Sequence, residues 1–136
     1  MEKVLLERWR RLMDENMHNI IGFLGLQLEK ADGRQIVLSM EADDRHLNPM
    51  SIVHGGVTAT LLDTAMGCAV YQACPDTRSV TTNLNVHYMA PLNKGKIFAT
   101  AEVEHRSRTT LTVTGKVTNA QGELCALATG SFRLVP

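Results

Sequence analysis

Apolar and polar residues recur with two different periods along this chain of 136 residues. Near its start, five apolar residues follow helical spacing: Val4, Leu5, Trp9, Leu12 and Met13. Charged residues fill most of the positions between them, so the pattern predicts an amphipathic helix from residue 2 to about residue 16. Residues 23–31 and 35–42 instead alternate apolar and polar positions on either side of the turn signal Asp32-Gly33, which predicts a hairpin of two strands.

A second helix is predicted in the middle of the chain. The run from Gly56 to about Ala73 is rich in Ala, Leu, Met and Thr and contains no proline, and Pro75 follows it. This pattern is typical of a long, mostly buried helix that ends before the proline. Gly67 costs such a helix about 1 kcal/mol relative to alanine, so we expect another backbone to pass close to it.

The rest of the chain is predicted to form four strands joined by short links: 78–90, 96–106, 109–118 and 123–134. Links of this length favour antiparallel neighbours. The order of elements therefore predicts an α+β fold. In it, a curved antiparallel sheet of about five to six strands wraps around one long central helix, and an extra helix precedes it.

The first of these four strands has two distinct faces. One predicted face carries Val80, Thr82, Leu84, Val86 and Tyr88. The other carries Thr81, Asn83, Asn85 and His87. The second face is polar without being charged, so we expect it to meet a partner subunit or to line a wet cleft, with an ordinary exposed strand as the alternative.

Length and charge limit the classes of function. The chain is long enough for one domain that buries about two-thirds of its unfolded surface, and we expect no second domain. Lys plus Arg and Asp plus Glu number 14 each, which does not favour nucleic acid, an anionic membrane or an acidic substrate as the main partner. No window approaches the roughly 18 to 20 apolar residues of a membrane span, so we expect a cytoplasmic protein.

The cysteines and histidines do not form a metal-binding pattern. Cys68, Cys74 and Cys125 lie in apolar or weakly polar surroundings without CxxC spacing. We expect them to be reduced, buried side chains rather than disulfide partners or zinc ligands. His46 and His87 also lack the spacing of metal ligands, which favours structural or surface roles for both.

Asp63 is the single charged residue between His46 and Pro75. On a helix it shares its face with small or apolar residues: Gly56, Ala59, Thr60, Met66, Gly67 and Val70. Such surroundings would strip water from the carboxylate and favour its taking a proton during catalysis. The alternative is an acid that faces solvent or caps a neighbouring backbone, but a solvent-facing surface normally carries more than one charge.

The sequence His54-Gly55-Gly56 stands where this helix is predicted to begin. The first N–H groups of a helix lack intrahelical acceptors and point outward with the positive end of the dipole, so they can receive a developing oxyanion. The glycines leave room for a substrate carbonyl beside the backbone, although glycines before a helix are also common in plain loops.

Together, these residues resemble a known family. Asn48, then His54-Gly55-Gly56, then Asp63, then Thr81 within TTNLNVHYMAP, and finally EHRSRTT follow the order and spacing of the hotdog-fold acyl-CoA thioesterases of the phenylacetate-degradation type. The resemblance extends from about residue 20 to the end of the chain. It implies a single hotdog thioesterase domain over residues 1–136, with an amphipathic helix at 1–18 and the hotdog core at 20–136.

The resemblance also implies an activity and a set of roles. The enzyme would hydrolyse an aromatic or short- to medium-chain acyl-CoA to the free acid and CoA. Asp63 of one subunit would be the nucleophile or general base, and the Gly55 N–H and the Asn48 side chain of the other would polarise the thioester carbonyl. His54 would position the loop or the leaving thiol, and Thr81 would hold the attacking water.

These roles imply a homodimer with shared active sites, and the family implies pairs of dimers that form a homotetramer. Asp63 lies nine positions after His54, which is roughly 13 Å along a helix and too far for both to act on one carbonyl from the same subunit.

Basic side chains are expected to hold the phosphates of the coenzyme. Charge and family together indicate Arg106, Ser107 and Arg108, with Gly56 and Lys94 as further contacts. We expect no metal and no cofactor apart from the CoA of the substrate, and no nucleic acid or membrane partner.

Two other functions share this fold. One is an acyl-thioester dehydratase or hydratase, which pairs a catalytic His with a carboxylate. It is disfavoured because His54 belongs to a glycine-flanked helix entry without a second acid. The other is a protein that binds acyl-CoA without hydrolysing it, and the sequence leaves this alternative open.

Overall fold

The computed structural model describes residues 2–136 and contains four helical segments and six strands. The helical segments are α1 (Glu2–Glu15), α2 (Ile20–Leu24), the 3-10 turn η1 (Asp44–His46) and α3 (Gly55–Ala73). The strands are β1 (Gln27–Ala31), β2 (Gln35–Ala42), β3 (Arg78–Tyr88), β4 (Gly95–Arg106), β5 (Thr110–Asn119) and β6 (Leu124–Val135).

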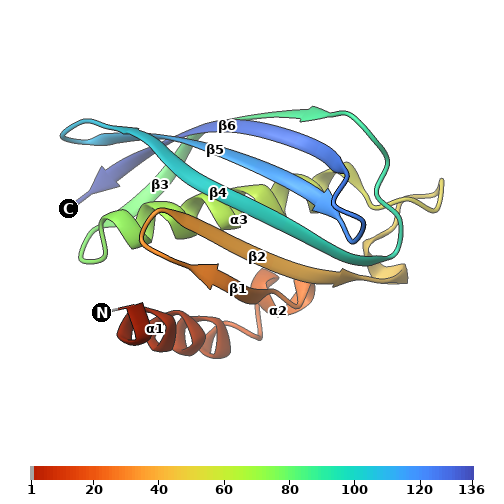
Figure 1. Cartoon of the computed structure of the whole chain (residues 1–136), viewed down its shortest axis with the longest axis horizontal. Coiled ribbons are helices and arrows are strands. Elements are labelled where there is room, and N and C mark those ends of the chain that lie inside the picture. Colours follow the sequence, from red (N-terminus) through yellow and green to blue (C-terminus); the bar gives the residue numbers. More distant parts are fainter. Residues whose placement is uncertain (1) are drawn as a thin grey trace.

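All six strands belong to one antiparallel sheet in the order β1-β2-β4-β5-β6-β3. The sheet curves around α3, and α1 lies beside β1 at one end of it (Figure 1). This arrangement confirms the predicted α+β hotdog fold with its long central helix and extra N-terminal helix. β1 and β3 stand at the two edges of the sheet, so each has one side without a strand partner among the described residues.

The core lies between α3 and the concave side of the sheet. Leu61, Leu62 and Met66 on α3 are fully buried, and burial of each such side chain contributes about 2 kcal/mol. Where they cross β5 and β6, the strands carry glycine. A Cβ on Gly115 would lie 3.0 Å from Leu62, and one on Gly130 would lie 2.7 Å from Met66. The glycines therefore let the helix approach the sheet closely.

The expectation of a close backbone at Gly67 is wrong. A Cβ at this position would meet only the Phe132 ring, at the ordinary contact distance of 3.8 Å. The close approach of α3 is made instead through strand glycines, which cost no helix propensity. Gly67 lines a pocket, as described below.

The first predicted strand begins too early. Residues 20–24 form the short helix α2, and β1 starts at Gln27. The Asn19 side chain accepts a hydrogen bond from the Ile21 N–H and so caps this helix, while Gly25 ends it in the left-handed conformation (φ 65°). Alternating apolar residues here mark one helical turn, not a strand.

A β-bulge in β3 changes which of its side chains face α3. Thr81 pairs with Phe132 of β6, whereas Asn83 pairs with Ser131, so Thr82 is an extra residue. Phe132 is buried and lies next to Gly67 of α3, so its partner Thr81 faces the helix as well.

The predicted division of β3 into two faces is therefore wrong on the N-terminal side of the bulge. Thr81 faces α3, and after the bulge the inward positions are Leu84, Val86 and Tyr88. Asn83, Asn85 and His87 point to the outer side, as each pairs with an outward residue of β6. Period-two alternation cannot reveal an inserted residue. The sequence continues to alternate through the bulge, whereas the side chains before and after it are shifted by one position between the two faces of the sheet.

Helix α1 covers one flank of the core. Trp9 and Met13 are buried, while most of the other described side chains of the helix are partly or fully exposed. The side chain of Leu5, which was predicted to share the apolar face, is outside the described part of the structure. Within residues 2–136, no helix is long and apolar enough to cross a membrane.

Candidate active site

The single acid of α3 meets a hydroxyl of β3. Thr81 Oγ1 donates a hydrogen bond to Asp63 Oδ1 over 2.7 Å, across a sequence separation of 18 residues. The bulge at Thr82 makes this contact possible because it turns Thr81 towards the helix. The carboxylate is only partly buried, so its second oxygen remains available for a water molecule or a carbonyl carbon. Asp63 and Thr81 therefore form one predicted half of a catalytic site.

The N-terminus of α3 forms a second group of predicted residues. The Gly56 N–H donates to His54 Nδ1 at 2.8 Å, and the Val57 and Thr58 N–H groups donate to the His54 carbonyl oxygen. The Gly55 N–H finds no acceptor among residues 2–136. It is therefore the helix-terminal amide that is free to receive an oxyanion.

The loop before α3 orients Asn48. Its Oδ1 accepts hydrogen bonds from the Met50 N–H at 2.9 Å and the Ile52 N–H at 3.3 Å. The tight loop places Ser51 in the left-handed region, with a φ of 64°. Because the amide oxygen is used by the loop, the Nδ2 group of Asn48 is left as a donor. The role predicted for Asn48 requires such a donor, and the role itself stays a prediction.

Asn48 and Gly55 line one cavity of about 400 Å³, together with Tyr88 and the segment Met89–Leu92. Asp63 does not line it. Gly55 and Asp63 are eight positions apart on a straight helix, which corresponds to about 12 Å. One copy of the chain therefore does not bring the predicted oxyanion donors and the predicted acid to a single carbonyl group.

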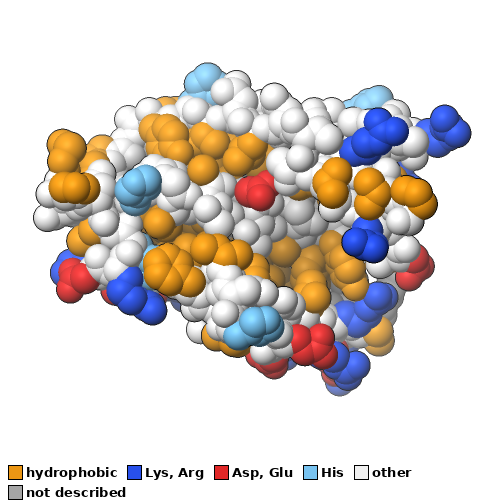
Figure 2. Space-filling view, turned by 180° about the vertical axis from the view of Figure 1, so that it is seen from behind, with side chains coloured by type: hydrophobic (Ala, Val, Ile, Leu, Met, Phe, Trp, Pro, Cys, Tyr) orange, Lys and Arg blue, Asp and Glu red, His pale blue; other side chains and the backbone are white. Residues whose placement is uncertain are grey.

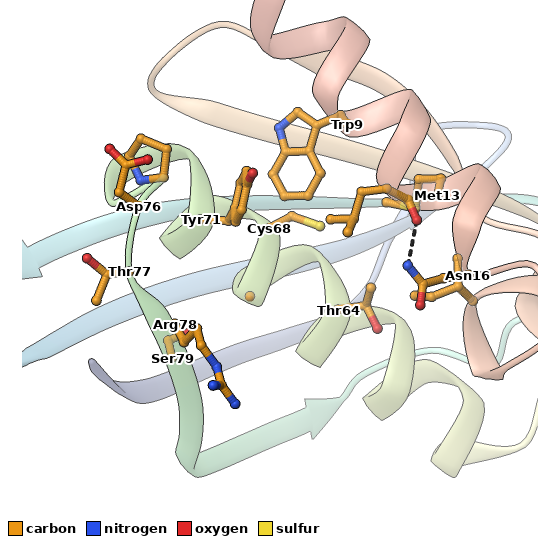
Figure 3. Close-up of a pocket in the computed structure, with 14 residues that line it drawn as sticks. Trp9, Met13, Asn16, Thr64, Cys68, Tyr71, Asp76, Thr77, Arg78 and Ser79 are labelled. Atoms are coloured by element: carbon orange, nitrogen blue, oxygen red, sulfur yellow. Dashed lines mark hydrogen bonds between the residues drawn. The ribbon is translucent and has the colours of Figure 1, made fainter. Parts of the chain in front are cut away.

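A larger pocket of about 550 Å³ opens between α1, α3 and the start of β3. Asp63 does not line this pocket, but Thr64 and Gly67, which follow it on α3, do, and Trp9, Cys68 and Tyr71 form its apolar floor (Figure 3). The Trp9 and Tyr71 rings pack at 4.7 Å between centroids with an interplanar angle of 56°. This pair of rings makes the floor of the pocket apolar.

Figure 2 shows the face opposite to that of Figure 1. Apolar side chains gather there around a hollow, and one acidic side chain lies among them. Along α3, the partly exposed positions include Ala59, Thr60, Asp63, Thr64 and Gly67. Such a surface, with a single charge on an otherwise uncharged helix, is unusual for a face that meets only water.

The predicted CoA contacts do not all come together in one copy. Arg106 and Lys94 flank opposite ends of β4, roughly 35 Å apart. Arg106 reaches the Ala73 carbonyl oxygen at the C-terminus of α3. Lys94 instead donates to Asp44 at 2.9 Å, and this hydrogen bond raises the lysine pKa.

Ser107 and Arg108 stay beside Arg106 in the β4–β5 turn. The Ser107 hydroxyl closes the turn by bonding to both the N–H and the carbonyl oxygen of Thr110. Arg108 is exposed. The two arginines therefore project from a fixed turn near the C-terminal end of α3, whereas Lys94 is separate from them.

The remaining candidates have structural roles. His46 is buried, accepts from the Asp43 N–H through Nδ1, and contacts the Phe23 carbonyl oxygen through Nε2 at 3.0 Å. Cys68, Cys74 and Cys125 are free thiols and buried, and burial raises the pKa of Cys68 to about 12. No group of three or more His, Cys, Asp or Glu side chains suited to a metal ion occurs in residues 2–136.

Comparison with known proteins identifies the family. The model of the thioesterase superfamily matches residues 50–126, which is more than half of the chain. The chain belongs to the thioesterase superfamily. It is accordingly a thioester hydrolase.

Several individual proteins are similar to this chain. Human acyl-coenzyme A thioesterase 13 is 30% identical over 113 residues, which cover 82% of this chain and 79% of that protein. The Escherichia coli PaaI protein from the phenylacetic acid degradation operon shares the fold with a TM-score of 0.89 at 23% identity, covering 100% of this chain and 97% of the other. The BH2602 protein of Bacillus halodurans, solved with CoA, is 41% identical with a TM-score of 0.70, covering 72% and 70% of the two chains.

Sequence reasoning missed two features of the candidate site. Tyr88 donates a hydrogen bond from its hydroxyl to the Gly55 carbonyl oxygen at 2.6 Å, so the end of β3 is tied to the start of α3. Trp9 supplies part of the floor of the larger pocket from a helix that was expected only to cover the core. Neither role has a local signal, because each depends on contacts between distant segments.

Proposed function

We propose that this thioesterase hydrolyses acyl-CoA at sites built from two copies of the chain. Asp63 of one copy acts as nucleophile or general base, and the partner copy supplies the Gly55 N–H and the Asn48 amide to the thioester oxygen. The observation that carries the proposal is the Thr81–Asp63 hydrogen bond of 2.7 Å, which orients the one acid of α3 four positions before Gly67 in the wall of the larger pocket.

The chemistry follows from these groups. In the general-base form, Asp63 takes a proton from a water molecule, which attacks the thioester carbonyl carbon. In the nucleophilic form, the carboxylate attacks first and water then hydrolyses the anhydride. In both, negative charge develops on the carbonyl oxygen, the C–S bond breaks, and the leaving thiolate takes up a proton. A donor to that oxygen typically contributes about 3 kcal/mol of transition-state stabilisation.

Three features support a dimer. The Gly55–Asp63 separation of about 12 Å requires a second copy if both act on one carbonyl. The outer edge of β3 can extend the sheet to a partner. The uncharged, partly exposed face of α3 also suits burial against an identical helix. We extend the proposal to a tetramer of two such dimers on the family resemblance alone.

The larger pocket suits an apolar acyl group of the aromatic or short- to medium-chain class. Gly67 lies one turn after Asp63, or about 6 Å along the helix, so a chain that leaves the carbonyl in this direction enters the pocket. For the coenzyme, we propose Arg106, Ser107 and Arg108 as phosphate contacts, and we keep Gly56 and Lys94 as secondary candidates. The CoA held by the BH2602 protein supports this class of leaving group.

Thiol release from a panel of acyl-CoAs tests the proposal. Wild type should release thiol from at least one class, and Asp63→Ala should lower kcat by at least a hundredfold while remaining folded and equally oligomeric. Equal rates for both proteins on every substrate would refute the role of Asp63. Binding of acyl-CoA by both proteins without any thiol release would show a binding protein instead.

A further inference from the structure

We propose that Tyr88 is a positioning residue of this site, which holds the His54 imidazole in the tautomer that donates from Nε2. The proposal rests on the function proposed above and adds a residue and a chemical form to it. Three hydrogen-bonding groups form the connection: the Tyr88 hydroxyl, the peptide unit between Gly55 and Gly56, and His54 Nδ1.

The first link joins β3 to α3. The Tyr88 hydroxyl donates to the Gly55 carbonyl oxygen at 2.6 Å. Its ring also lies against Gly55, because a Cβ there would stand 3.5 Å from three ring and hydroxyl atoms. Tyr88 is the last residue of β3, and the bulge earlier in the strand leaves it on the side of the sheet that faces the helix. The contact therefore fixes the position of the first peptide of α3.

The second link passes through that peptide. The Gly55 carbonyl and the Gly56 N–H belong to one planar unit, so a bond that fixes the direction of the oxygen also fixes the direction of the N–H. A donor on the oxygen also polarises the unit and strengthens the hydrogen bond made by its N–H. The Gly56 N–H donates to His54 Nδ1 at 2.8 Å.

The third link determines the form of His54. A ring nitrogen that accepts a hydrogen bond carries no proton, so the neutral imidazole must carry its proton on Nε2. His54 is exposed, and its Nε2 finds no partner among residues 2–136. In this form, His54 can donate to the thioester oxygen or to the leaving sulfur, but it cannot take a proton from water or from a substrate carbon.

This assignment has a consequence for the reaction. A dehydratase or hydratase needs a histidine that accepts a proton, and the network around Gly55 and Gly56 holds His54 in the opposite role. Asp63 then remains as the base or nucleophile of the site. Tyr88, whose hydroxyl donates to the Gly55 carbonyl oxygen, acts through the peptide and the imidazole.

The test compares Tyr88→Phe with wild type. Removal of the hydroxyl keeps the ring against Gly55 and deletes one hydrogen bond, so kcat should fall about tenfold with KM changed less than twofold. Thr114→Val serves as the control, because it deletes a side-chain hydrogen bond of similar length, 2.7 Å to Glu104. That bond lies on the outer side of the sheet, away from the site. The kcat of Thr114→Val should therefore equal that of wild type.

Nitrogen-15 NMR of the imidazole rings reports which nitrogen of His54 carries the proton. If Tyr88 only stabilised the fold, these signals would not change in a folded Tyr88→Phe. The chain has five His residues, and loss of one signal pair in His54→Gln assigns His54. In wild type, Nε2 should be the protonated nitrogen and Nδ1 the bare one. In Tyr88→Phe, the two nitrogens should shift towards each other as both tautomers become populated.

The outcomes separate this proposal from the proposed function. A protonated Nδ1 in wild type overturns the proposal, even if Tyr88→Phe fails to fold. Unchanged kcat and unchanged His54 signals in a folded Tyr88→Phe also overturn it. Absence of thiol release in wild type would instead remove the proposed function, while the NMR spectra would still decide the tautomer of His54.

Discussion

At the scale of single residues, the site depends on how hydroxyl and amide groups are already used. The Thr81 hydroxyl donates a hydrogen bond to Asp63, so its oxygen is free to accept a hydrogen bond from a water molecule. Asn48 gives its oxygen to the loop and keeps its amide protons. In both cases, an internal hydrogen bond leaves the complementary part of the side chain for the substrate or the water.

Thr81→Val should lower kcat about tenfold and raise KM less, because it removes the hydroxyl that orients the carboxylate and the water but preserves the shape of the side chain. Steady-state kinetics on an accepted acyl-CoA measures both constants. Thr82→Val is the matched control, since its hydroxyl bonds only to the Ser131 carbonyl oxygen. An unchanged kcat in Thr81→Val would assign the water to another group.

The turn between β1 and β2 gives a pH-dependent prediction. Asp32 accepts hydrogen bonds from the Gln35 and Arg34 N–H groups, which lower its pKa from 3.8 to about 2. The folded state therefore holds the ionised form more tightly than the unfolded state does. This stabilisation is present above pH 3.8 and disappears as the pH falls through about 2.

Asp32→Ala should therefore be less stable than wild type at neutral pH, and the difference should shrink as the pH falls towards 2. Urea unfolding at several pH values measures it. Asp32→Asn, which keeps an acceptor oxygen without the charge, should lose less stability than Asp32→Ala at neutral pH. A difference that stays constant from pH 7 to pH 2 would contradict the role given to the carboxylate.

At the scale of elements, the glycine of α3 and the glycines of the strands packed against it have different structural roles. Gly67 faces the open pocket, whereas the position of a Cβ on Gly130 is blocked by Met66 and by the Asn83 carbonyl oxygen at 3.1 Å. The backbone oxygen cannot move aside as a flexible side chain can. Only the strand glycine is required by close packing.

Gly67→Ala should stabilise the fold by up to about 1 kcal/mol, because alanine favours the helix and meets nothing closer than 3.8 Å. Gly130→Ala should destabilise it by about 1 to 3 kcal/mol through overpacking. Chemical denaturation measures the free energy of unfolding of both variants. Each variant is the control for the other, because both replace a glycine by alanine. Stabilisation by both would show that the sheet can move away from α3.

The elements themselves were largely predictable, because hydrophobic periodicity is local. The long helix and the four strands that follow it lie within about two residues of their predicted bounds at most ends. One failure has a non-local cause, and the other has local signals that the strand pattern obscured. The bulge at Thr82 depends on pairing with β6, and α2 depends on an Asn cap and a Gly stop that interrupt an apparent strand pattern.

For the site, the identity of the acid was indicated by its isolation on an uncharged helix, and the structure places Thr81 against it. The larger pocket was not predictable, because α1 and α3 are distant in the sequence. The same holds for the contact between Tyr88 and Gly55, which are 33 positions apart. Local patterns identify chemical groups, whereas the space around those groups comes from packing.

At the scale of the whole molecule, the proposed sites exist only when two copies meet. One copy contributes Asp63, Thr81 and the larger pocket, and its partner contributes Asn48 and Gly55. A defect in one copy can therefore be compensated by the intact half of the other.

Asp63→Ala and Asn48→Ala should each be inactive alone and should regain activity when mixed and allowed to exchange subunits. Random exchange at equal concentrations gives one complete site in each hybrid dimer, or about a quarter of wild-type activity. The activity of the mixture after mild unfolding and refolding measures this. Two separately refolded samples, combined without exchange, are the control, and no recovery would place all the groups in one copy.

The extra residue in β3 also affects how this chain is aligned with its relatives. A relative whose strand lacks the bulge carries its inward hydroxyl one position away, and column-by-column matching would pair Thr81 with a side chain on the far side of the sheet. The equivalent hydroxyl in a relative is therefore identified by its cross-strand partner, which for Thr81 is Phe132 of β6. By contrast, deletion of Thr82 alone would remove the bulge and leave Thr81 opposite Phe132, so the partner of Asp63 would still face the helix.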